Sequence, residues 1–149
     1  RALLDLSGQI VKWISAEGGN GQLKEERGLL QQGLDDVTAI VTTMINDLGT
    51  TVPGVPHSDP RNIYKVGLNT TRLLMVLGDL ICAWLLLRGA EVALGRLNDE
   101  LMASEKAFYE GKVASGRWFA RTVLPKLAAE RSIAEATDLA VMDLDEAAF

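Results

Sequence analysis

The chain has 149 residues, 48% of them hydrophobic and 23% charged, which is ordinary for one globular domain with a single core. Its formal net charge of −5 argues against a nucleic-acid partner, because phosphate binding requires clustered Lys and Arg. The only cysteine, Cys82, excludes an internal disulfide and makes a reducing, cytoplasmic setting the expectation.

Two amphipathic helices are predicted before residue 50. Helical periodicity begins at Leu3 without a cap, so we expect a piece of a longer protein. The first helix covers about residues 2–16, and the glycines of segment 18–21 (GGNG) form a helix–helix turn, since no strand or Gly-Lys-Ser/Thr precedes or follows them as in a phosphate loop. Asn20 is the expected cap of the second helix, and Gly49 closes it. Its apolar seam has the four-three spacing of a left-handed bundle: Leu30, Leu34, Val37, Val41, Met44 and Leu48.

A proline-rich connector, residues 50–60, is predicted to lead into the third helix, because its three prolines disfavour a helix. Asp59 and Pro60 suit the cap and first residue of that helix, which should end near residues 97–99. His57, the only histidine, lies in the connector without the companions of a catalytic or metal site. We therefore expect an exposed loop residue.

The third helix contains the most apolar segment of the chain, residues 71–94. Between Arg72 and Arg88 its only charge is Asp79. A helix that is apolar on nearly all sides must be surrounded by protein or by lipid. Because the interval is shorter than the roughly 20 apolar residues of a membrane span, we expect the central helix of a soluble bundle, wrapped by its neighbours, with a membrane-inserted hairpin as the lesser alternative.

Asp79 is expected to be buried and paired, since an ionised carboxylate among Leu and Ile side chains is costly alone. The nearest expected cations are Lys112 and Arg117 on the fourth helix. A structural pair that fixes helix register is favoured over a functional carboxylate. A seven-residue spacing places Lys65, Arg72 and Asp79 on one stripe. A solvated face is expected for Arg88, Glu91 and Gly95.

The fourth helix is expected to be capped by Ser104, with Glu105 in its first turn. Pro125 should restart the chain as a fifth, shorter helix over residues 126–138, followed by an acidic tail. The inward stripe of the fourth helix is predicted to be Phe108, Gly111, Ser115, Trp118 and Thr122. Small residues that would allow close helix approach are Gly111, Ala114, Ser115 and Gly116.

Arg117, Trp118, Phe119 and Arg121 have the composition of a coenzyme or nucleotide clamp, with rings for stacking and guanidinium groups for phosphate. An amphipathic helix with its rings inward and its arginines in solvent is the favoured alternative. The sequence has no Gly-x-Ser-x-Gly, Glu-x-x-His or Cys-x-x-Cys pattern. We therefore predict no catalytic, cofactor-binding or metal residue in this chain.

Residues 64–94 and 108–127 together resemble the extra C-terminal domain of the larger bacterial acyl-CoA dehydrogenases. The resemblance includes Lys-Val-Ala-x-x-Arg-x-Phe-Ala at residues 112–120, Val-Leu-Pro at 123–125 and an acidic ending in Ala-Phe. It implies a parent flavoenzyme in which FAD takes hydrogens from the α and β carbons of an acyl-CoA thioester. The glutamate base of that family lies in the dehydrogenase body upstream, so no residue here is assigned its role, and the chain alone should neither bind flavin tightly nor turn over substrate.

The resulting expectation is all-α: an antiparallel up-and-down bundle of four main helices with a short fifth, forming one domain over residues 1–149. The resemblance implies an accessory role that stabilises the enzyme and its homodimer, with the dehydrogenase body as partner and acyl-CoA as the substrate of the parent. Gly111 and Gly116 are the expected close-contact positions. The alternative is a free-standing helical adaptor or regulatory bundle that binds a partner protein.

Overall fold

The computed structural model describes residues 2–16 and 18–148, and the described part is helical with no strand, which confirms the all-α prediction. Its α-helices are α1 (Ala2–Ser15), α2 (Lys24–Gly49), α3 (Asn62–Arg96), α4 (Ala103–Thr122) and α5 (Leu127–Glu135). Three single 3-10 turns complete it: η1 (Gly19–Gly21), η2 (Leu124–Lys126) and η3 (Glu146–Ala148). The ends of the first three helices fall within three residues of those predicted.

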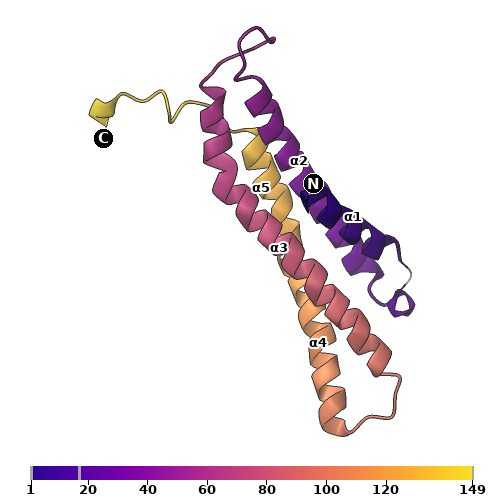
Figure 1. Cartoon of the computed structure of the whole chain (residues 1–149). Helices are drawn as coiled ribbons and strands as arrows, with labels where there is room; N and C mark the ends of the chain where they lie inside the picture. The colour runs from indigo at the N-terminus through magenta and orange to yellow at the C-terminus, as the bar shows by residue number, and fades with distance from the viewer. Residues whose placement is uncertain (1, 17, 149) are drawn as a thin grey trace.

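The long helix α3 organises the arrangement (Figure 1). Helices α2 and α4 each pack along α3, and α5 follows α4 after η2 and lies against α2. Helix α1 contacts α2. Pro125 in η2 separates α4 from α5 as predicted, because proline cannot donate the backbone hydrogen bond of a continuing helix.

Two hydrophobic clusters lie along α3. The larger cluster joins α1, α2, the middle of α3 and α5, around Leu30, Ile40, Leu80 and Leu87. The smaller one joins the turn before α2 to the end of α3 and to α4. Its buried members are Leu23, Ala90, Ala93, Leu94 and Val113.

The predicted seam of α2 is confirmed over most of its length, but its last turn is wrong. Leu30, Leu34, Val37 and Met44 are buried as predicted, whereas Leu48 is exposed. A helix of 3.6 residues per turn rotates by about 20° per heptad relative to a strict four-three seam. The core side of α2 therefore turns away from Leu48.

The predicted helix caps lie one to four residues from the observed starts. Asn20 takes a left-handed conformation (φ 51°) in η1, and α2 begins only at Lys24. Ser104 lies inside α4, and the Glu105 carboxylate instead accepts a hydrogen bond from the Met102 backbone N–H at 3.1 Å. Asn20 and Ser104 therefore predicted the approximate position of each helix start, but neither is the residue at which the helix begins.

Asp59 caps the turn that precedes α3. Its Oδ1 accepts the Arg61 backbone N–H at 2.9 Å, and α3 begins at Asn62. Hydrogen bonds from the Arg61 guanidinium lower the pKa of the Asp59 carboxyl below its ordinary value. The connector before it is a series of turns without helix, as predicted, and His57 is exposed there with φ 59°.

Candidate functional site

A buried ion pair ties three helices together near the turn between α1 and α2. Arg27 is 8% exposed, and its Nη2 lies 2.5 Å from Glu91 Oε1 on α3. The same guanidinium donates to the Trp13 carbonyl and lies 3.8 Å from the centre of the Trp13 ring. Glu91 Oε2 accepts the Trp13 Nε1–H at 2.8 Å. The expectation of a solvated Glu91 is therefore wrong, because the α1–α2 turn folds back over the end of α3.

A second charged cluster joins α2 to α4. The Glu26 side chain is 1% exposed, and its Oε1 lies 2.8 Å from Arg121 Nη2 and 3.8 Å from Arg117 Nε. Arg121 also contacts Glu25 at 2.8 Å. Both arginines thus have carboxylate partners within the fold, and Trp118 is 65% exposed on α4. The favoured alternative of inward rings is therefore wrong for Trp118. The clamp alternative stays a prediction, in which a phosphate would have to compete with the carboxylates of α2 for both arginines.

Asp79 does not form the predicted pair. It is half-buried and lines a cavity of about 310 Å³ beside Arg72 and Glu130, which pair with each other. Arg117 is engaged by Glu26, and no cation of the described residues lies within ion-pair distance of Asp79. The reason is geometric: α4 packs on the later half of α3, whereas Asp79 faces η2 and α5. Because the Asp79 carboxylate is only partly buried, solvent can hydrate it and it does not require a cation partner.

Replacing Asp79 with alanine is accordingly expected to change the free energy of unfolding by no more than about 0.5 kcal/mol. Urea unfolding followed by circular dichroism measures this change. A loss of several kcal/mol would show that Asp79 has a buried partner after all.

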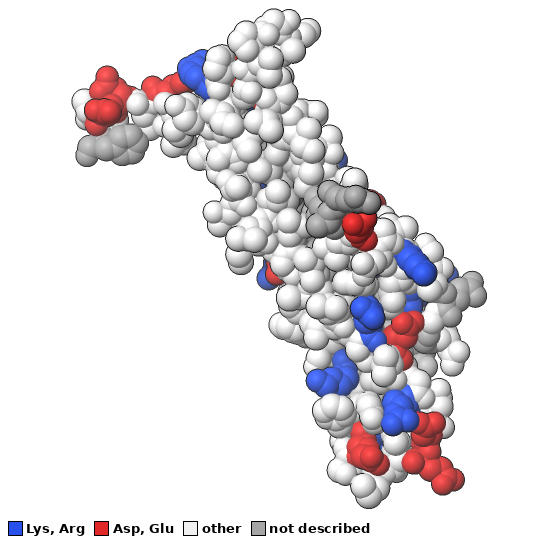
Figure 2. Space-filling model, in the orientation of Figure 1, with Lys and Arg blue, Asp and Glu red and all other residues white. Residues whose placement is uncertain are grey.

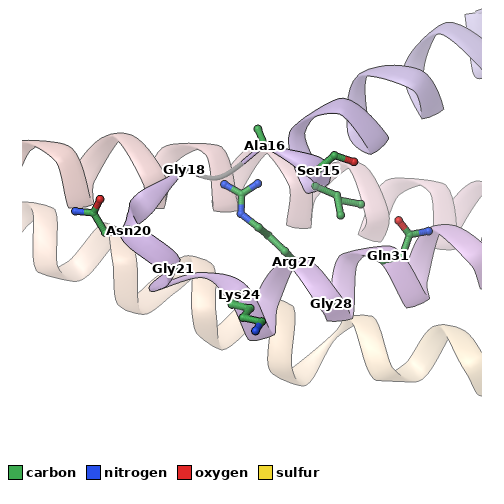
Figure 3. A pocket seen from close by; sticks show the side chains of 10 residues that line it. Ser15, Ala16, Gly18, Asn20, Gly21, Lys24, Arg27, Gly28 and Gln31 are labelled. Atoms are coloured by element: carbon green, nitrogen blue, oxygen red, sulfur yellow. The ribbon is translucent and has the colours of Figure 1, made fainter.

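A cavity of about 600 Å³ lies between the end of α1, η1 and the start of α2 (Figure 3). Lys24, Arg27 and Gln31 approach it from α2, and small residues of the turn form its other wall. Its described lining contains no aromatic ring, and the charge of Arg27 is already met by Glu91. A lining without an aromatic ring offers no surface on which the ring system of a flavin could stack, so these residues do not fit that cofactor. In the part of the chain that the structure describes, no three His, Cys, Asp or Glu side chains are grouped to hold a metal.

Part of the surface of α3 is apolar and uncovered. Leu74, Met75, Leu85 and Val92 are each more than half exposed, and Cys82 is exposed among them. Figure 2 shows a broad surface with few charged side chains over the upper half of the molecule, with most of the charges toward the lower end and on the C-terminal tail. The prediction that α3 is wrapped on all sides is therefore wrong, because the other helices gather on one side of it. By length and composition α3 is able to cross a membrane, a test that core helices of soluble proteins also pass.

Helix α4 turns the opposite face inward from the one predicted. Val113, Gly116 and Ala120 are buried, while Phe108 and Trp118 are exposed. A Cβ added at Gly116 would lie 3.0 Å from the Leu86 carbonyl oxygen, so the two helix backbones approach too closely for large side chains to lie between them. The predicted stripe has helical spacing but borders solvent. Of the predicted contact glycines, Gly116 contacts α3 within the fold and Gly111 is exposed.

The outward side chains of α3 and α4 border a groove of about 560 Å³. Leu85, Gly89 and Val92 line it from α3, and Phe108 and Ser115 from α4. The groove has an apolar floor and a single charged lining residue, Lys112. Such a surface suits an apolar partner segment better than a polar small molecule.

Comparison with known proteins identifies the family of the chain. It matches the family described as "Acetyl-CoA dehydrogenase C-terminal like" over residues 6–145. The chain belongs to this family. It is also 43% identical over 148 residues to the broad-specificity linear acyl-CoA dehydrogenase FadE5 of Mycobacterium tuberculosis. The alignment covers 99% of this chain but only 23% of FadE5, in its C-terminal part.

Family membership confirms the resemblance noted in residues 64–127 and extends it to the first two helices. The sequence was sufficient to predict the family of the domain, but it did not predict which charged side chains are buried. Glu26 and Arg27 lie in a run of four charged residues, Lys24 to Arg27, which is usually a solvated helix start. Only the fold-back of the α1–α2 turn onto Glu91 and the crossing of α4 bury them.

Proposed function

We propose that the chain is the C-terminal accessory domain of an FAD-dependent acyl-CoA dehydrogenase that converts acyl-CoA to 2-enoyl-CoA in fatty-acid β-oxidation. FAD and acyl-CoA bind to the dehydrogenase body, and this domain stabilises that body and its homodimer. Residues 1–149 act as one antiparallel up-and-down helical domain in the cytoplasm. Family membership supports this role over that of a free-standing adaptor.

The observation that carries the proposal is the amount of surface left uncovered. The accessible surface is 9453 Å², whereas a compact monomer of this mass exposes about 7,400 Å². Part of the exposed surface is apolar helix surface, formed by Leu74, Leu85 and Val92 on α3, Phe108 and Trp118 on α4, and Ile45 on α2. Large uncovered apolar surfaces mark contacts with other protein.

The test compares the parent enzyme with a version that lacks this domain. The truncated enzyme is expected to lose at least about 5 °C of melting temperature, since even 1 kcal/mol shifts the melting temperature of a large domain by roughly 2–4 °C. The initial rate of acyl-CoA oxidation at low temperature should fall far less. A truncated enzyme with unchanged thermal stability and unchanged dimer content would refute the proposal.

A further inference from the structure

A cavity of about 260 Å³ lies between α1, α2 and α3. We call it the α1 cavity. Its floor is formed by buried apolar side chains from all three helices: Ile10 from α1, Leu34 and Val37 from α2, and Leu80 from α3. The exposed lining residues are Leu4, Thr38 and Thr42. The α1 cavity therefore opens between α1 and α2, and the rest of its wall belongs to the hydrophobic core.

The hydroxyl groups in the lining of the α1 cavity have no proton left for a ligand. Ser7 Oγ donates to the Leu4 carbonyl at 2.9 Å. Thr38 Oγ1 donates to the Leu34 carbonyl at 2.7 Å, and Thr42 Oγ1 donates to the Thr38 carbonyl at 2.8 Å. Because these three hydroxyl protons are bonded within the helices, the described lining side chains offer a ligand mainly methyl and methylene groups.

The α1 cavity also differs in charge from the cavities described above. Charged residues line the cavity at the α1–α2 turn, the cavity beside Asp79 and the α3–α4 groove. No described lining residue of the α1 cavity is charged. A charged ligand would lose its hydration there without gaining a partner. The lining therefore favours an uncharged molecule.

The volume of the α1 cavity sets the size of that molecule. Protein interiors are packed as densely as organic crystals, with few voids larger than a water molecule. Water inside an apolar cavity lacks the hydrogen bonds that hold buried water in place, and an apolar cavity of about 150 Å³ binds benzene. The same degree of filling gives 260 Å³ room for about ten carbon atoms. A peptide segment would bring backbone N–H and C=O groups that need partners, so a small molecule fits better.

Helix α1 is held more firmly at its end than at its beginning. Near the end, Trp13 is tied to Arg27 and Glu91. Near the beginning, Leu4 is 75% exposed although it lines the α1 cavity. A molecule in the cavity would contact both α1 and α2 and add apolar contacts where α1 has few.

We propose that the α1 cavity binds an uncharged aliphatic molecule of about eight to ten carbon atoms. The floor residues Leu34, Val37 and Leu80 contact its chain, and any polar end lies at the opening, near Thr38 and Thr42. This site is formed by the chain alone and does not depend on the accessory role proposed above.

Titration of the methyl-labelled 149-residue chain with 1-octanol tests the site by nuclear magnetic resonance. The methyl signals of Leu34, Val37 and Leu80 are expected to shift and to saturate together, as for one binding site. The exposed α3 residues Leu74 and Val92 report non-specific binding, and their signals should change far less. No saturable shift at the floor residues, or shifts confined to the exposed α3 residues, would overturn the proposal.

A substitution that fills the α1 cavity gives a second measurement. Ser7→Leu places a larger apolar side chain in the lining and removes only a hydrogen bond within α1, so it is expected to weaken 1-octanol binding at least tenfold. Thr70→Leu is the matched control. Thr70 is exposed on α3, bonds its hydroxyl to the Gly67 carbonyl at 2.6 Å and lies outside the described lining, so this variant should bind 1-octanol as the unchanged chain does. Equal affinities of the Ser7→Leu and unchanged chains would contradict the site.

Octanoate tests the chemical class of the ligand. It has the same chain length as 1-octanol but carries a charge at neutral pH, and no described cation lines the α1 cavity to offset that charge. Octanoate is therefore expected to bind at least tenfold more weakly. Equal binding of octanoate and 1-octanol would refute the assignment to uncharged molecules. The truncation experiment on the parent enzyme reports on docking to the body, so the two proposals fail independently.

Discussion

Gly116→Leu is expected to lower the free energy of unfolding by about 3 kcal/mol, the upper end of what overpacking usually costs. A Cβ at this position would lie 3.0 Å from the Leu86 carbonyl oxygen and 3.1 Å from the Ala90 Cβ. Backbone cannot move aside as a flexible side chain can, so a full leucine side chain must push α4 away from α3. Urea unfolding of the variant and the unchanged chain measures the difference.

Gly111→Leu is the matched control on the same helix. Gly111 is exposed, and an added Cβ would meet no atom within 4 Å. Leucine is a better helix former than glycine by nearly 1 kcal/mol, so this variant should be slightly more stable than the unchanged chain. Equal losses for the two variants would mean that Gly116 is not at a close helix contact.

Glu91→Ala is the second large effect, with an expected loss of about 3 kcal/mol, at the lower end of the range for breaking a buried pair. Removal of the carboxylate leaves the 8% exposed Arg27 without a counter-ion and the Trp13 Nε1–H without its acceptor. The partial exposure of Glu91, 27% of its side chain, is the reason for choosing the lower figure, because solvent screens part of the charge. Thermal and urea unfolding both report it.

The exposed pair Lys106–Glu110 supplies the control for Glu91. Its atoms are 3.9 Å apart on the surface of α4, and such pairs contribute at most a few tenths of a kcal/mol. Glu110→Ala should therefore be nearly neutral. A double-mutant cycle of Arg27→Ala and Glu91→Ala should give a coupling energy of about 1–3 kcal/mol. A coupling near zero would contradict the buried ion pair.

The sequence allowed the helices to be predicted well and their orientation less well. Apolar spacing placed α2 and α3, and Pro125 placed the break between α4 and α5, since these signals are local. The face of α4 was assigned by the size of its rings, Phe108 and Trp118. The core instead takes Gly116 and Ala120, because α3 approaches too closely for rings. The distance between two packed helices depends on the side chains of both, so it cannot be predicted from the sequence of either helix alone.

The charged residues show the same limit. Asp79 drew attention because its neighbours in sequence are apolar, yet the structure leaves it half-exposed. Glu26 lies among other charges in sequence and is fully buried. Burial of a single side chain is decided by segments distant in the chain, here α4 and the α1–α2 turn. No spacing within α2 contains that information.

The two hydrophobic clusters on α3 differ in what holds them. The smaller cluster, around Ala90 and Val113, lies at the end of the molecule that holds two ion-paired carboxylates, the buried Glu26 and the partly exposed Glu91. Its half of the molecule therefore depends more on charge attraction than the half built by α2 and α5, and dissolved salt weakens attraction between partly exposed charges. In concentrated salt the α4 end should open first, while the α2–α5 end, held mainly by the hydrophobic effect, keeps its amide protons from exchanging with solvent.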